Sequence, residues 1–240
     1  MQPFLGGPTY CETPPVAAFY AGNLSFPVEP MNTVSNGVIM LFGLAALYLT
    51  IKRAPRTVDL YVLSVLLIFT GFGSGMWHGF RDGIWLQWEV LSGLFFLFTL
   101  VFCWARRLWS YLGATVVLLA FYLGFQYSRE FFGIGLFGIA GRWVAIAPLV
   151  IGTGIVMITQ TYFRSKQAAL TGGLALASGL VALTFRTVDL SVCPYIPWGT
   201  HSLWHSFLSA GGFLGILTLV RLPAVKKTRP VPVTSPEAAE

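Results

Sequence analysis

The chain has three histidines, His78, His201 and His205, and imidazole nitrogen atoms are good ligands for a transition metal. His201 and His205 are four residues apart, so on a helix both rings lie on one face, one turn apart. That spacing allows two nitrogen atoms to bind one ion, and His78 would add a third ligand and leave a fourth position for water. Nitrogen ligands favour zinc over calcium or magnesium, with iron and copper as alternatives. The other interpretation is that these histidines only form hydrogen bonds near a membrane surface.

A carboxyl group and a hydroxyl group accompany the histidines. Glu89 begins an apolar segment, where an ionisable side chain is costly and therefore a functional candidate. It would act as general base toward a metal-activated water and return the proton to a leaving group; the alternative is a hydrated carboxylate or one paired with Arg81. Ser74 precedes His78 by four residues and shares its helix face, where the hydroxyl would bind the metal or donate to an oxyanion. A serine in such a glycine-rich helix end otherwise serves close packing.

The elements that must position these side chains are membrane-spanning helices. The chain of 240 residues is 55% hydrophobic and only 10% charged, with a mean hydropathy of +0.72. It therefore lacks the charge needed to solvate a surface that faces water. Seven apolar runs approach the length of a membrane span, at 32–51, 58–77, 84–104, 108–127, 143–162, 168–187 and 200–220. Helices satisfy their backbone groups in lipid, so we predict an all-α bundle of seven transmembrane helices. We expect an extramembrane segment at 1–30, a membrane domain at 31–221 and a disordered tail at 222–240.

The distribution of basic residues predicts the orientation of this bundle. Eleven of the fifteen Lys and Arg residues fall in segments on one side of the predicted membrane, which indicates the cytoplasmic side. The N-terminus is then outside, the C-terminus is cytoplasmic, and all three histidines and Glu89 lie near the outer leaflet, on the non-cytoplasmic side. The net charge of +6 does not indicate nucleic-acid binding, because the basic residues punctuate apolar runs instead of clustering on a polar face.

The predicted topology places the three cysteines on different sides of the membrane. Cys11 and Cys193 fall on the predicted outside, whereas Cys103 lies at the cytoplasmic end of the third span. In an oxidising compartment the outside pair can form a disulfide, which would tie the N-terminal segment to the loop before the last span and close a lid over the metal site. Two unpaired thiols are the alternative.

Three segments carry a resemblance to a known family. Residues 31–36 (MNTVSN), the run from Gly71 to His78 with an acidic residue eleven positions further on, and the run from Gly199 to His205 resemble the alkaline ceramidases. That family belongs to a superfamily of seven-helix membrane hydrolases that includes the adiponectin-receptor and haemolysin III-like proteins. The resemblance covers most of the chain in order and spacing.

The resemblance implies a zinc-dependent amidase that cleaves the N-acyl bond of ceramide to a sphingoid base and a fatty acid. By this resemblance His78, His201 and His205 would hold the zinc, Ser74 would stabilise the oxyanion, and Glu89 would be the acid/base group. The family usually has aspartate at that last position, so this chain's carboxylate is one methylene longer. Cys11 and Cys193 also match the family's positions, in agreement with a disulfide.

A calcium site is a further expectation that comes from the resemblance. Similar ceramidases bind calcium through an Asp-Trp-Cys-Glu run, an Asn and a further Glu before the Asn-Thr-Val-Ser-Asn motif. This chain has Thr9-Tyr10-Cys11-Glu12 and Pro14, so only Glu12 and Glu29 remain as possible oxygen ligands. A pair of surface glutamates is the alternative.

These features together predict a membrane enzyme that hydrolyses a lipid amide, with its substrate entering sideways from the bilayer. A seven-helix lipid-binding receptor or signalling protein with a structural zinc is the alternative from another class. A transporter is disfavoured, since paired broken helices and inverted repeats are not evident.

Overall fold

The computed structural model describes residues 7–132 and 146–222, with side chains described for 7–127 and 146–222. Within these ranges the chain forms helices and no strands, as the all-α prediction requires. The helices are α1 (Val16–Tyr20), α2 (Pro30–Arg53), α3 (Val58–Phe80), α4 (Gly83–Leu108), α5 (Tyr111–Phe132), α7 (Ala147–Tyr162), α8 (Lys166–Val192) and α9 (His201–Arg221). The tail predicted to be disordered falls outside the described residues, apart from Leu222.

Five of these helices, α2, α3, α4, α8 and α9, are long and apolar enough to cross a membrane. The stretch 111–127 of α5 and the whole of α7 are apolar but shorter. Many large apolar side chains face outward from the bundle, among them Leu41, Phe95, Leu112 and Leu170, which is the surface that lipid would cover. The protein is therefore a multi-pass membrane protein by helix length and composition.

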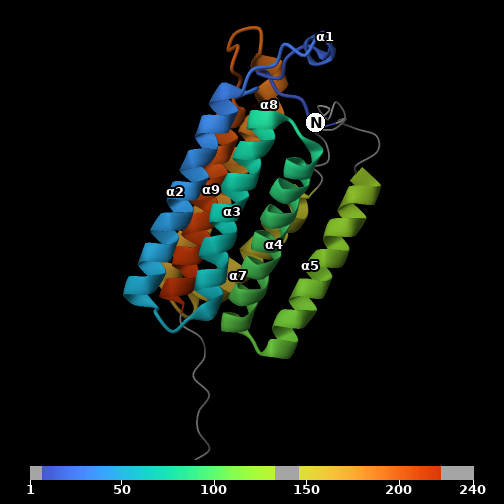
Figure 1. Ribbon diagram of the computed structural model, residues 1–240. Helices are drawn as coiled ribbons and strands as arrows, with labels where there is room; N and C mark the ends of the chain where they lie inside the picture. The colour runs from blue at the N-terminus through green and yellow to red at the C-terminus, as the bar shows by residue number, and fades with distance from the viewer. Residues whose placement is uncertain (1–6, 133–145, 223–240) are drawn as a thin grey trace, which may run out of the picture.

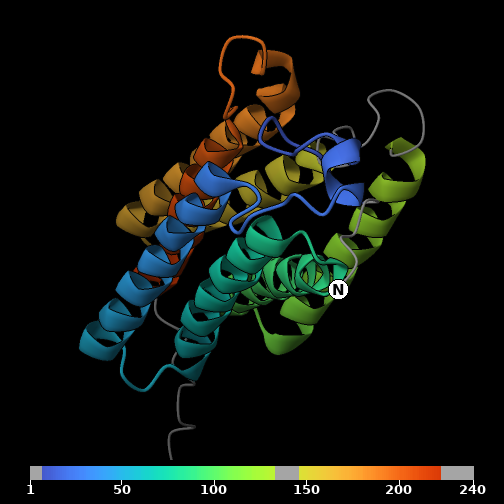
Figure 2. The same ribbon diagram turned by 45° about the horizontal axis from the view of Figure 1, so that its top comes forward.

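The long helices pack lengthwise against one another (Figure 1). Helix α2 packs on α3 and α9, α3 packs on α4, and α8 packs on α9, so α3 and α9 lie in the interior of the bundle. Helix α5 stands at the edge, where it contacts α4 and α7 (Figures 1 and 2). The buried apolar core includes Leu60, Leu63, Leu67, Ile216 and Leu219, all from α3 and α9. The two helices that carry the histidines are the most buried of the five long apolar helices.

The two ends of the bundle differ in their polar side chains. At one end lie the last turns of α2, α4 and α9, which carry Lys52, Arg53, Arg106, Arg107 and Arg221. We call this the arginine end. At the other end the N-terminal segment and α1 cross over the helix ends (Figure 2), close to where α3 ends and α9 begins. We call this the histidine end.

Among the boundaries that the structure shifts, one bears on the candidate site. The sixth apolar run was expected to end at Thr187, but α8 continues to Val192. Asp189 therefore lies inside the helix, and not in a loop beyond it. The first residue that stops a helix after Thr187 is Pro194, which accounts for the extension.

Candidate metal centre

The three histidines converge at the histidine end, as the sequence predicts. His78 comes from the last turn of α3, and His201 and His205 come from the first two turns of α9. One ligand atom from each lies within 4.8 Å of those of the other two, and their ring centroids are 4.5 to 5.1 Å apart. All three residues are at most 1% exposed. Among the described residues this is the one group of three or more His, Cys, Asp or Glu side chains with such geometry.

The histidines leave buried nitrogen atoms without hydrogen-bond partners. These are Nε2 of His78, Nε2 of His205, and both ring nitrogens of His201. Buried polar atoms in native proteins are almost always hydrogen-bonded, because leaving one unpaired costs from about 1 kcal/mol to several kcal/mol. Three such rings facing one another therefore differ from histidines that only satisfy hydrogen bonds. The donor set fits a transition metal ion with three imidazole ligands.

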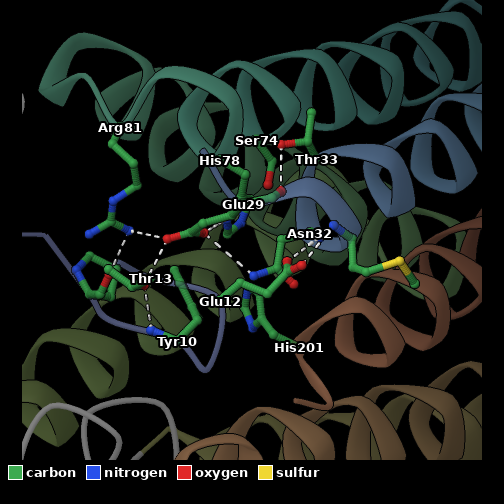
Figure 3. A network of polar contacts seen from close by, with 12 residues as sticks. Tyr10, Glu12, Thr13, Glu29, Asn32, Thr33, Ser74, His78, Arg81 and His201 are labelled. Carbon is green, nitrogen blue, oxygen red and sulfur yellow. Dashed lines mark hydrogen bonds and ion pairs between the residues drawn. The ribbon is translucent and has the colours of Figure 1, made fainter. Parts of the chain in front are cut away.

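His78 is held by a buried carboxylate. Its Nδ1 bonds to Oε2 of Glu29, the residue just before α2 (Figure 3). The other oxygen, Oε1, accepts a hydrogen bond from Thr13 at 2.7 Å and forms an ion pair with Arg81 at 3.1 Å. Burial raises the pKa of Glu29, and the positive charge of Arg81 opposes that rise. A carboxylate on Nδ1 fixes the ring and leaves Nε2 as the metal-facing atom, which is the usual arrangement around a histidine ligand.

His205 is held by a hydroxyl. Oγ of Ser35 on α2 lies 2.7 Å from Nδ1, and the same hydroxyl donates to the backbone oxygen of Asn32 at 2.9 Å. A hydroxyl has a single hydrogen, so with that hydrogen on Asn32 it accepts from Nδ1–H of the ring. The lone pair of His205 is then on Nε2, the atom that faces the cluster.

His201 is held in a different way, by its backbone and by an aromatic ring. Asp189 Oδ1 accepts hydrogen bonds from the backbone N–H groups of Thr200 and His201 at 2.7 and 2.9 Å, so α8 caps the N-terminus of α9. The ring of Tyr10 stacks on that of His201 at 4.0 Å and lies 4.9 Å from His78. Burial is the main cause that raises the pKa of Tyr10, so its phenol stays neutral. Tyr10 thus covers the cluster from the N-terminal segment.

Ser74 and Glu89 contact each other. Ser74 Oγ donates to Oε1 of Glu89 at 3.1 Å, while Oε2 of Glu89 is buried without a hydrogen-bond partner. Gly73 makes this contact possible, because a Cβ there would lie 3.2 Å from the backbone nitrogen of Glu89 and push α3 and α4 apart. The alternative pairing of Glu89 with Arg81 does not occur, since the ion-pair partner of Arg81 is Glu29.

The two glutamates expected to bind calcium have other contacts. Glu12 accepts hydrogen bonds from the backbone N–H groups of Met31 and Asn32 at 2.9 and 2.8 Å, which satisfies donors at the start of α2. Burial raises the pKa of Glu12, and these two N–H groups oppose the rise. Glu29 bonds to His78 and Arg81 as described above. Calcium binding stays a prediction, and both carboxylates have structural roles in this arrangement.

The predicted disulfide is present. Cys11 and Cys193 are bonded, and Cys103 is a buried free thiol. The bond ties the residue after Tyr10 to the end of α8. Gly199 completes this corner with φ of +65°, because any side chain there would collide with Asp189 and with Cys11. The N-terminal segment is thereby fixed over the histidines.

Several residues near the cluster, Ser35 among them, were missed by reasoning from the sequence. Tyr10, Arg186 and Asp189 all contribute to it, and Arg186 lies with its guanidinium 4.6 Å from the ring centroid of Tyr10. For Arg186, which lies within the predicted sixth run, a signal was present, because an ionisable side chain within a spanning helix is costly. Asp189 lay beyond the predicted end of that run. Tyr10 gave no comparable signal, since its position depends on the path of the N-terminal segment.

Comparison of the chain with protein-family models, with curated proteins and with solved structures found no match. The resemblance to alkaline ceramidases stays a prediction, and the geometry of the site carries the functional argument.

Proposed function

We propose that this protein is a zinc-dependent membrane hydrolase that cleaves the acyl amide bond of a lipid. The observation that carries the proposal is the convergence of three buried histidines whose facing nitrogen atoms have no hydrogen-bond partner. A structural zinc site normally has four protein ligands, whereas a catalytic one has three and keeps one position open. The described residues provide three histidine ligands.

The residues around the cluster suit amide hydrolysis. A zinc ion held by His78, His201 and His205 would lower the pKa of a water molecule toward neutrality and polarise the amide carbonyl. Glu89 would accept the proton of the attacking water and return it to the departing amine. Ser74 would donate its hydroxyl hydrogen to the oxyanion that develops on the carbonyl oxygen. Its present hydrogen bond to Glu89 keeps both groups together.

The proposal includes a topology of seven spans with the histidine end on the non-cytoplasmic side. The basic side chains at the ends of α2, α4 and α9 support this, because Lys and Arg are enriched on the cytoplasmic side. A disulfide at the opposite end supports it too, because such bonds persist in oxidising compartments. Helices α5 and α7 would be the remaining spans.

A lipid substrate is the choice that suits the location of the site. The cluster lies where spanning helices end, so an acyl chain would extend along the bundle while its polar end reaches the histidines. Ceramide, or another N-acyl sphingoid base, is proposed on the resemblance alone, and related lipid amides belong to the same class.

One observation favours a second function, that of a lipid-binding receptor with a structural zinc. The histidines are almost completely buried, and Tyr10 covers them. A substrate would have to enter from the side of the bundle, or the N-terminal segment would have to move. In the receptor the metal would only hold α3 and α9 together.

Turnover by the purified protein separates these functions. Protein in detergent with one equivalent of zinc is supplied with N-acyl sphingoid bases and with other lipid amides, and the released amine is measured. The hydrolase is expected to release amine from at least one, and Glu89→Gln is expected to retain zinc but lose at least about a hundredfold in turnover. Zinc bound at one equivalent with no product from any lipid amide would exclude the enzyme and favour the receptor.

A further inference from the structure

Arg186 is a buried cation within the spanning helix α8 and next to the metal centre. It is 7% exposed, similar to the other buried arginines, Arg81 and Arg107. Those two form ion pairs with Glu29 and Asp59. Arg186 has no hydrogen-bond acceptor and no ion-pair partner within the residues that the structure describes.

Among the described side chains no carboxylate forms an ion pair with the guanidinium of Arg186, although the charges of Glu29 and Glu89 act on it at longer range. Its Cζ lies 4.6 Å from the ring centroid of Tyr10, a cation–π contact, and the same ring stacks on His201 at 4.0 Å. Asp189 is one turn further along α8, but its carboxylate accepts from the backbone N–H groups of Cys11, Thr200 and His201. The carboxylate of Asp189 is therefore committed to the cap of α9.

A buried guanidinium without an ion-pair partner among the described side chains is costly, and an anion that binds there would offset the cost. A guanidinium presents a planar fork of donors that matches a carboxylate in two parallel hydrogen bonds. The site therefore suits a carboxylate better than a neutral hydroxyl group.

We propose that Arg186 binds a carboxylate carried by the lipid ligand, beside the histidine cluster. The binding itself does not depend on catalysis, but the source of the carboxylate rests on the proposed function. Hydrolysis of an acyl amide by one water molecule yields a fatty carboxylate and an ammonium, so the product is one source. The other is a substrate whose amine part is acidic, such as an N-acyl amino acid.

The first experiment measures equilibrium binding to the purified zinc-loaded protein in a non-ionic detergent. The probes are oleate and oleyl alcohol, which share a chain and differ in the anionic group. The wild-type protein is expected to bind oleate at least about tenfold more tightly, as a charge-assisted pair would give. Arg186→Gln should lose this preference and still bind oleyl alcohol as the wild type does. Arg53→Gln, at an exposed arginine at the far end of α2, is the matched control and should keep the preference.

Three outcomes would overturn the inference. One is a wild-type protein that binds oleate and the alcohol equally. Another is an Arg186→Gln variant that keeps the preference. The third is a variant that loses both ligands equally, because Arg186 would then act only by supporting Tyr10. Since neither measurement involves turnover, a protein without hydrolase activity could still pass this test.

The second experiment distinguishes the two sources. N-oleoylglycine and N-oleoylethanolamine are compared as ligands, because one amine part is anionic and the other neutral. An acidic substrate predicts a preference of about tenfold for N-oleoylglycine that Arg186→Gln removes. A site for the product predicts equal binding of these two amides together with a preference for oleate over oleyl alcohol. A chain that shows neither preference contradicts both.

Discussion

The two ends of the bundle both bury charged side chains, but they use them differently. At the arginine end Asp59 forms ion pairs with Arg106 at 3.1 Å and with Arg107 at 2.7 Å. Arg164 donates to the backbone oxygens of Arg107 and Leu108, which closes the start of the loop after α4. Apart from Nε of Arg107, the charged groups of this cluster have partners. The arrangement joins α3 and α4 and supports the end of the bundle.

At the histidine end the polar contacts hold side chains but leave their functional atoms unused. Glu29 and Ser35 each bond to the Nδ1 atom of a histidine, while the Nε2 atoms and one oxygen of Glu89 have no partner. The difference indicates that the arginine end is complete without a ligand and the histidine end is not. Substitutions at the two ends should therefore affect different properties, namely stability at one and metal binding at the other.

The largest effect is expected for His201→Ala. Loss of one of three ligands should lower zinc affinity by more than about a hundredfold, since even loss of a residue that only supports a ligand costs 10 to 100-fold. Zinc per chain, measured by mass spectrometry of the purified variant, should fall close to zero, and amide hydrolysis should be abolished with it. A variant that retains one equivalent of zinc would show that His201 is not a ligand.

Asp59→Asn should lower the stability of the protein and leave its zinc binding unchanged. Removing the carboxylate charge leaves Arg107, which is 1% exposed, without its ion-pair partner, and we expect a loss of about 2 kcal/mol in the free energy of unfolding. Titration with SDS in mixed micelles measures it. Zinc content should stay at one equivalent. If zinc were lost as well, the two ends would not be independent.

The three histidines of the metal centre could be predicted from the sequence, whereas most of the residues that support them could not. Hydropathy and basic residues predict the direction of each helix, and that direction alone brings His78 and His201 to one end. The roles of Glu29 and Tyr10 depend on how the N-terminal segment folds over the bundle, and local patterns do not encode such contacts. Asp189 lay beyond the predicted sixth run, which ends at Thr187, although the helix continues to Val192.

A smaller effect is expected for Ser35→Ala. The substitution removes the hydrogen bond to Nδ1 of His205 while leaving all three ligands, so zinc affinity should fall by about tenfold. Competition with a chromogenic chelator measures this. Ser206→Ala is a matched control, because the Ser206 hydroxyl donates to the backbone oxygen of Ser202 on its own helix. Equal affinities for the two variants would mean that Ser35 does not support the site.

The smallest effect is expected for Glu12→Ala. The carboxylate accepts from two backbone N–H groups at the start of α2, so its loss should lower the free energy of unfolding by about 1 kcal/mol. The same variant tests the calcium prediction. If calcium raises the melting temperature of the wild type and not of the variant, Glu12 is a calcium ligand in addition to its role as a cap.

The central claim is that the histidine end holds a metal with one open position. X-ray absorption at the zinc edge of the purified, active protein tests this most directly, because it reports the number and type of ligand atoms. We predict one zinc per chain with three histidine nitrogens at about 2.0 to 2.1 Å and one further oxygen. A chain with no metal, or a zinc bound by sulfur or by fewer than three nitrogens, would contradict the account.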